Sequence, residues 1–162
     1  MRKLFLFILL IVFAVSCTKE VPETEKKSAK ATYEKDIRKI IETYADNFNA
    51  GKTEDSFILF SEDFKAVVPD SDNALDLTTY KDNLKRFKKQ YPTGKLQITI
   101  EEVFLSEELG TVQLFTSYLA PDVLDGKLSP VYSERSILIF RKIKYDGWKI
   151  IRSLGTPAFS YD

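Results

Sequence analysis

Two charged residues, Glu134 and Arg152, stand among apolar neighbours on two segments whose alternating pattern predicts β-strands. The residues spaced to share a face with them are Tyr132, Leu138 and Phe140 for Glu134, and Trp148, Ile150 and Leu154 for Arg152. A buried charge is costly unless it has a partner. We therefore expect Glu134 and Arg152 either to pair with each other or to meet a polar group of a ligand.

Two further residues could take part in proton transfer. Tyr44 lies on a predicted helix, and Asp70 follows a predicted strand. With Asp70 or Glu134 as the base and Tyr44 as the acid, the chain would hold an acid–base pair. Tyr44 also lies on the apolar stripe of its helix, so core packing explains it without any chemistry.

Several kinds of site are disfavoured by what the 162-residue sequence lacks. It has no histidine and a single cysteine, which removes the commonest general base and the usual zinc ligands. The run Asp70-Ser71-Asp72-Asn73 begins like a calcium loop, but Ala74 and Leu75 stand where a ligand and a glycine are needed. No metal or cofactor is therefore expected.

The first half of the chain is predicted to be mainly helical. An apolar stripe from Ile37 to Phe48 has helical spacing and stops at Asn49-Ala50-Gly51. A short helix is expected from Thr53, a strand over 64–68, and a third helix from Thr78 or Thr79 to about Tyr91.

The second half is predicted to be a β-meander. Strands are expected over 96–101, 111–119, 132–143 and 148–154, with Asp146-Gly147 as a hairpin signal between the last two. The order of elements predicts an α+β fold, with helices gathered on one face of a curved antiparallel sheet.

The N-terminus resembles a bacterial lipoprotein signal. Arg2 and Lys3 precede a twelve-residue apolar run over 4–15, too short to span a bilayer, and Cys17 follows it. The resemblance implies cleavage before Cys17 and acyl chains on its thiol. We thus expect a signal peptide over 1–16, a lipidated Cys17 and flexible tether over 17–30, and one domain over 31–162.

Two stretches resemble the nuclear transport factor 2-like, or SnoaL-like, superfamily: ETYADNFNAGKTEDSFILFSEDFKAVVP and SILIFRKIKYDGWKII. The resemblance implies a cone-shaped domain with three N-terminal helices on the curved sheet and a pocket between them. It also implies a homodimer formed through the outer sheet face. The residues expected to line the pocket are Tyr44, Phe48, Phe87, Tyr118, Glu134, Trp148 and Arg152.

Ketosteroid isomerases, in the same superfamily, offer a residue-by-residue comparison. Tyr44, four residues before Phe48, matches their oxyanion-binding tyrosine. Their general-base position corresponds to Val68, and their second carboxyl position corresponds to Leu138. Since a base is indispensable for moving a proton between carbons, isomerase chemistry is not expected.

Three functions remain open at this point. The leading hypothesis is a lipid-anchored envelope protein whose non-catalytic pocket binds a small apolar molecule or a partner protein. The alternatives are a SnoaL-like isomerase, cyclase or hydrolase, and a structural envelope protein that docks through its sheet face. A pocket filled by side chains would favour the structural hypothesis. An open apolar pocket would favour binding, and an open pocket that holds a carboxylate would favour an enzyme.

The net charge of the chain and the position of its cysteine indicate which partners to expect. The sequence has 24 basic and 24 acidic residues; loss of residues 1–16 would remove Arg2 and Lys3, leaving 22 basic residues and a net charge of −2. This balance gives no argument for nucleic-acid binding. The expected partner is a membrane, reached through Cys17. Thr18, which is not the aspartate that retains some lipoproteins in the inner membrane, favours the outer membrane.

Overall fold

The structure is a computed structural model that describes residues 23–68 and 73–158. Its helices are α2 (Glu23–Asn49), α3 (Thr53–Ser56) and α4 (Leu77–Gln90), with a 3-10 turn η1 (Phe57–Leu59). Its strands are β1 (Phe60–Val67), β2 (Leu75–Asp76), β3 (Lys95–Leu105), β4 (Leu109–Pro121), β5 (Leu128–Ile143) and β6 (Gly147–Pro157).

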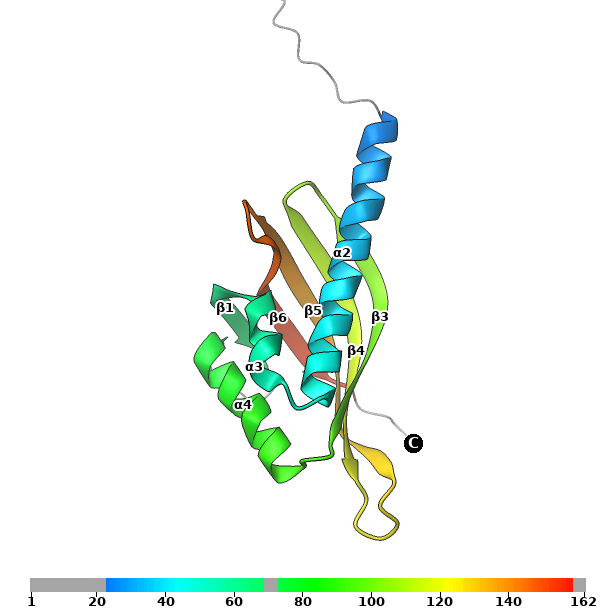
Figure 1. The fold of residues 1–162 in the computed structure, drawn as a ribbon, viewed down its shortest axis with the longest axis vertical. Helices are drawn as coiled ribbons and strands as arrows, with labels where there is room; N and C mark the ends of the chain where they lie inside the picture. Colours follow the sequence, from blue (N-terminus) through cyan, green and yellow to red (C-terminus); the bar gives the residue numbers. More distant parts are fainter. Residues whose placement is uncertain (1–22, 69–72, 159–162) are drawn as a thin grey trace, which may run out of the picture.

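The six strands form one curved, unclosed sheet in the order β2-β1-β6-β5-β4-β3. The helices pack against it, with α2 crossing the sheet lengthwise and α3 and α4 beside it (Figure 1). The predicted α+β class is confirmed. The sheet is mixed rather than purely antiparallel, because β1 runs parallel to β6. Alternation along a strand does not report the direction of its neighbour, so this pairing could not be predicted from the residue pattern.

The core lies between the helices and the inner sheet face. The helical stripe of α2 is buried from Ile37 to Phe48, as its spacing predicts. The strands contribute Phe64, Val112 and Phe140, each fully buried. Burial of side chains this large is worth roughly 1.5–3 kcal/mol each, so these contacts fix the position of α2 on the sheet.

Helix α2 begins earlier than expected. Residues 23–30, predicted to belong to a flexible tether, form its first two turns. The charged residues there suit a helix, because Glu23 and Lys27 are four residues apart and their side chains approach to 3.0 Å. Residues 17–22, the rest of the expected tether, lie outside the described residues.

The ends of the helices are held by side chains. The Asn49 amide accepts from the Leu96 N–H at 2.7 Å and donates to the Leu96 carbonyl at 2.9 Å, which ties the end of α2 to β3. Gly51, at φ 77°, supplies the left-handed residue of the stop. Helix α4 is capped by Asp76, whose carboxylate accepts from the Thr79 N–H, rather than by a threonine.

The hairpin between β5 and β6 forms where Asp146-Gly147 predicted it. Its turn is closed by a hydrogen bond from the Asp146 N–H to the Ile143 carbonyl. Tyr145 takes a positive φ of 77° there, and its side chain is 93% exposed. Among the described residues, no helix has both the length and the apolar character needed to cross a membrane.

Candidate functional site

Three tyrosines and one carboxylate come together at the inner sheet face. Tyr44 comes from α2, Tyr80 from α4, Tyr118 from β4 and Glu134 from β5. Burial raises the pKa of the Tyr44 and Tyr118 hydroxyls well above their ordinary value, and it raises the pKa of Tyr80 to about 12. The negative charge of Glu134 adds to all three shifts. The hydroxyls are therefore neutral near pH 7 and can donate hydrogen bonds.

Glu134 is held by its neighbours on the sheet. Its carboxylate accepts a hydrogen bond from the Tyr132 hydroxyl at 3.2 Å. Gly155 leaves the space that the carboxylate fills, since a Cβ there would lie 2.9 Å from Oε2. Burial raises the pKa of Glu134, and the Tyr132 hydrogen bond opposes the shift. Within residues 23–68 and 73–158, no ion pair to a basic side chain involves Glu134.

The Tyr44 hydroxyl is the other unusual group. It is buried and makes no hydrogen bond of normal geometry among the described residues, although the Tyr80 hydroxyl lies close enough to raise its pKa. Its ring packs edge-to-face on Phe60, with centroids 5.6 Å apart. A buried hydroxyl without a partner costs on the order of 1–3 kcal/mol in stability. Tyr44 therefore either contributes through the packing of its ring or donates a hydrogen bond from its hydroxyl to a ligand.

Aromatic rings lie beside these polar groups, and their meeting at this point is what the structural hypothesis, with docking through the sheet face, expects of the pocket. Phe48, Phe87 and Tyr118 form one cluster, in which the Phe87 and Tyr118 centroids are 5.3 Å apart. Trp148, also predicted to line the pocket, is buried in a different place, against Tyr33 near the start of α2. The structure thus brings together Tyr44, Phe48, Phe87, Tyr118 and Glu134, and it leaves Trp148 apart from them.

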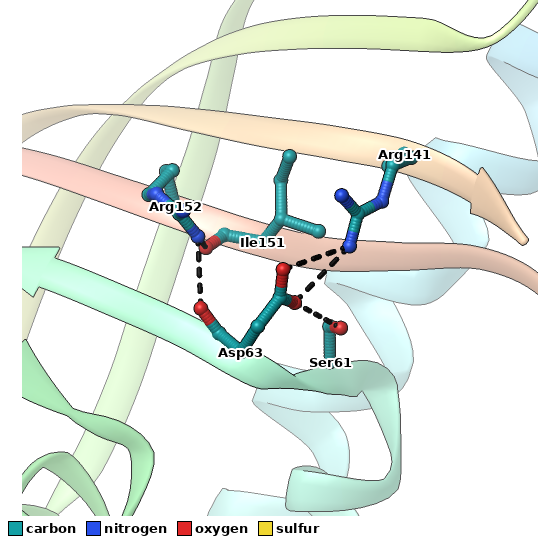
Figure 2. Close-up of polar contacts among 5 residues, drawn as sticks. All are labelled: Ser61, Asp63, Arg141, Ile151 and Arg152. Carbon is teal, nitrogen blue, oxygen red and sulfur yellow. Dashed lines mark hydrogen bonds and ion pairs between the residues drawn. The ribbon is translucent and has the colours of Figure 1, made fainter.

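Arg152 does not join Glu134. A bulge in β6 next to Ile150 shifts the register, so Arg152 pairs with exposed Lys65 of β1 while the adjacent Ser153 is buried. This places Arg152 on the outer face, where its guanidinium donates to the Asp63 carbonyl at 2.9 Å (Figure 2). The expectation of a shared inner face and a Glu134–Arg152 pair was wrong, because one inserted residue reverses the alternation.

Asp63 organises this outer cluster. Its carboxylate accepts from Arg141 Nη2 at 2.9 and 3.1 Å and from the Ser61 hydroxyl (Figure 2). The Ser61 hydrogen bond first, and then Arg141, lower the pKa of Asp63. Through Arg141 and Arg152, Asp63 joins β1 to β5 and β6. We assign the cluster to holding the parallel strand in place.

The two positions that correspond to the isomerase carboxyl groups hold apolar residues, and these lie in apolar surroundings. Val68 and Leu138 are half-buried and pack against the core. Asp70, the other candidate base, lies outside the described residues. No group of three or more residues able to hold a metal ion occurs among the described residues.

Comparison with solved structures identifies the architecture. An NTF2-like protein with a cystatin-like fold from Novosphingobium aromaticivorans aligns with a TM-score of 0.69 at 13% identity, covering 86% of this chain and 90% of that one. The chain has the nuclear transport factor 2-like fold. No protein-family model matches the sequence, and no curated protein matches it.

Two other structures with this fold carry provisional enzyme names. A provisionally named scytalone dehydratase from Novosphingobium aromaticivorans gives a TM-score of 0.68 at 14% identity, covering 82% of this chain and 89% of that one. A provisionally named dehydratase of the NTF2-like family from Streptomyces avermitilis gives 0.65 at 16%, covering 80% and 99%. At these identities the likeness establishes the fold alone.

Sequence reasoning missed three contributors to the site. Tyr80 appeared only as part of an apolar stripe, and Tyr132 only as a neighbour of Glu134. Gly155 was not singled out at all. Tyrosines spaced two residues from a strand carboxylate, as Tyr132 is from Glu134, were the available signal, because residues i and i+2 share a strand face.

Proposed function

We propose that the chain is a lipid-anchored protein of the bacterial envelope whose inner sheet face binds a small, largely apolar molecule without catalysis. The observation that carries the proposal is the half-buried Glu134 carboxylate, which accepts a hydrogen bond from Tyr132, whose ring in turn packs 5.9 Å from that of Tyr118 in the aromatic cluster. Apolar sites with a few placed polar groups are typical of small-molecule binding. Aromatic rings would hold the body of the ligand, and Glu134 would orient one polar group.

The absence of catalysis is proposed on two grounds. Val68 and Leu138 occupy the positions of the isomerase base and its second carboxyl group, and both pack into the core. The sequence also has no histidine to replace them. With apolar residues at both isomerase carboxyl positions, Glu134 has no second carboxyl group to work with, and a lone carboxylate serves recognition better than turnover.

One observation favours an enzyme as the second candidate. Glu134 has a raised pKa, and the Tyr44 hydroxyl is buried without a described partner. Such a pair could act as base and acid in an isomerase, cyclase or hydrolase of the SnoaL-like kind. In that event a ligand recovered from the protein would be converted, and Tyr44→Phe would stop the conversion.

The binding proposal is tested by native mass spectrometry on the protein purified gently from its host. We expect an added mass that leaves on denaturation and that is lost or reduced in Glu134→Gln. Asp63→Asn, a matched carboxyl-to-amide change on the outer face, should keep the added mass. A clean apo mass for the wild type, with a co-purifying protein, would instead support docking to a partner.

The anchor is tested separately. We propose that residues 1–16 are removed and that Cys17 carries the acyl chains that hold the protein at the envelope, in the outer membrane where the cell has one. The intact mass of the envelope protein should correspond to a chain beginning at acylated Cys17. Cys17→Ser should leave an unprocessed chain without incorporated palmitate, and an unmodified Cys17 in the wild type would refute the anchor.

A further inference from the structure

A large groove lies outside the inner-face site, at the end of the molecule where α2 begins. It has a volume of about 1110 Å³ and is bordered by α2 and by the β3–β4 and β5–β6 turns. Figure 1 shows the first turns of α2 rising beyond both turns at this end.

The groove lies where α2 extends beyond its close contact with β4 at Ile37. Gly110 of β4 lets the helix come close there, since a Cβ on Gly110 would lie 2.9 Å from Ile37 Cδ1. Ile37 is fully buried, whereas the helix before it is exposed or half-buried. The β3–β4 turn is joined to the end of β5 by a hydrogen bond from the Lys142 N–H to the Glu108 carbonyl at 2.9 Å. The walls are therefore built by packed, hydrogen-bonded elements.

The lining is amphipathic. Tyr33, Leu105 and Ile143 supply apolar surface, with half-buried side chains. Charges of both signs surround this surface, from lysines at 30, 142 and 144 and glutamates at 107 and 108. Across the described part of the chain, no ion pair joins these lysines to these glutamates. Both signs are thus available to a ligand that carries apolar chains and a headgroup with a negative and a positive charge.

Aromatic residues extend from the groove into the core. The Lys142 ammonium lies 3.8 Å from the centroid of the Tyr33 ring, and Tyr33 packs edge-to-face on Trp148 at 5.6 Å. At the tip of the β5–β6 turn, Tyr145 has a positive φ of 77° and an exposed side chain. A non-glycine residue in this conformation stores strain of about 1–3 kcal/mol. An exposed tyrosine beside lysines is typical of surfaces that meet the headgroup layer of a membrane.

The position of the groove favours one occupant. The 22 residues before Glu23 connect at this end, so a lipid anchor at Cys17 would be six residues from α2. We propose that the groove binds a phospholipid of the surrounding membrane whose headgroup carries both a phosphate and a primary amine. The lysines meet the phosphate, Glu107 and Glu108 meet the amine, and Tyr33, Leu105 and Ile143 contact the acyl chains. Only the closeness to the membrane rests on the proposed anchor.

Trp148 is the only tryptophan in the chain, so its fluorescence reports on this end of the molecule. The full chain is placed in phosphatidylcholine nanodiscs, where either acylated Cys17 or the apolar run of residues 4–15 holds it. Acyl-brominated phosphatidylethanolamine is then added, and quenching of Trp148 is compared with that by phosphatidylcholine and phosphatidylglycerol brominated in the same way. We expect quenching to saturate at the lowest lipid fraction with phosphatidylethanolamine.

Variants separate the groove from general membrane contact. Lys30→Glu combined with Lys144→Glu should weaken the phosphatidylethanolamine effect by roughly tenfold or more in lipid fraction, because both changes place a negative charge where the phosphate would lie. Lys39→Glu, on the same helix but outside the groove, should leave it unchanged. Glu107→Gln with Glu108→Gln should shift the preference towards phosphatidylglycerol.

Two results would overturn the proposal. One is equal quenching of Trp148 by the three brominated lipids. The other is quenching that responds to Lys39→Glu as strongly as to the paired groove change. Neither result bears on ligand binding at Glu134, and an unmodified Cys17 would not alter either, so this test and those of the proposed function fail independently.

Discussion

The Glu134 carboxylate occupies the space that a side chain on Gly155 would take, with Oε2 placed 2.9 Å from where a Cβ would lie. Gly155 belongs to β6 and is paired with Ser136 of β5, two residues from Glu134. Gly155 therefore allows the charged side chain of Glu134 to pack against the sheet instead of pointing to solvent. This placement explains why burial raises the pKa of Glu134.

Gly155→Ala should displace the carboxylate. Because the atom that must move is the far end of a flexible side chain, we expect a stability change of less than about 1 kcal/mol. We also expect the Glu134 pKa to fall towards its ordinary value as the carboxylate turns to solvent. A carboxyl-detected NMR titration measures this shift, and Glu134→Gln identifies the resonance. An unchanged pKa would show that Gly155 does not control the position of Glu134.

Glu134 should also make stability depend on pH. Its pKa is raised in the folded protein, so between the unfolded and folded pKa values the folded state binds more protons. Stability is then highest below the unfolded value and falls as pH rises through the folded value. Replacing Glu134 with glutamine removes this loss, and Tyr132 can still donate to the amide oxygen.

Urea unfolding at two pH values measures the effect. Glu134→Gln should gain stability relative to the wild type at pH 7, and the difference should shrink near pH 4. Glu101→Gln, a matched change at a residue with an exposed partner in Arg135, should not reproduce this trend. A Glu134→Gln difference that is constant across pH would contradict the burial argument.

The Asp63 cluster should contribute to the stability of the sheet and not to ligand binding. Arg152→Ala removes the hydrogen bond to the Asp63 carbonyl, and Arg141→Ala removes an exposed ion pair. Exposed pairs are worth about 0–1 kcal/mol, so each change should lower the free energy of unfolding modestly. The ligand mass retained at the inner face should stay as in the wild type. A loss of ligand in Arg152→Ala would show that Arg152 contributes to ligand binding.

Arg152 also shows how far sequence reasoning reached. Helix α2 and strands β3 to β6 were predictable, because periods of 3.6 and 2 persist over their buried residues. The bulge beside Ile150 interrupts the two-residue alternation of β6 and leaves no mark in the residue types. Counting in steps of two from Trp148 therefore assigns Arg152 to the wrong face of the sheet. The parallel β1–β6 pairing depends on contacts between residues far apart in sequence, and it leaves no local pattern.

The candidate site was predictable in part for the same reason. Glu134 was found because it departs from the apolar pattern around it, whereas Tyr44 lies on the apolar stripe of its helix and was found through the resemblance to ketosteroid isomerases. The groove beside Tyr33 was not, since it arises where α2 continues past the edge of its contact with β4. Residues 23–30 have the composition of a charged linker. They form a helix because the packed helix that follows them supplies the nucleus, and extending a helix costs less than starting one.

Tyr44→Phe distinguishes packing from chemistry at the centre of the fold. The phenylalanine keeps the ring contact with Phe60 and removes a buried hydroxyl that has no described partner. If Tyr44 serves packing alone, the variant should be as stable as the wild type or more stable by up to about 1–3 kcal/mol, the usual cost of such a hydroxyl. Denaturant unfolding of the apo protein measures this difference.

The same variant should then be tested with the recovered ligand. Under the proposed binding function, Tyr44→Phe retains the ligand mass and the ligand is unchanged in either protein. Under the acid–base alternative, the wild type converts the ligand and the variant does not, although both remain folded. A variant that is destabilised and also loses the ligand would mean that the Tyr44 hydroxyl makes a structural hydrogen bond in solution, contrary to its unpartnered position here.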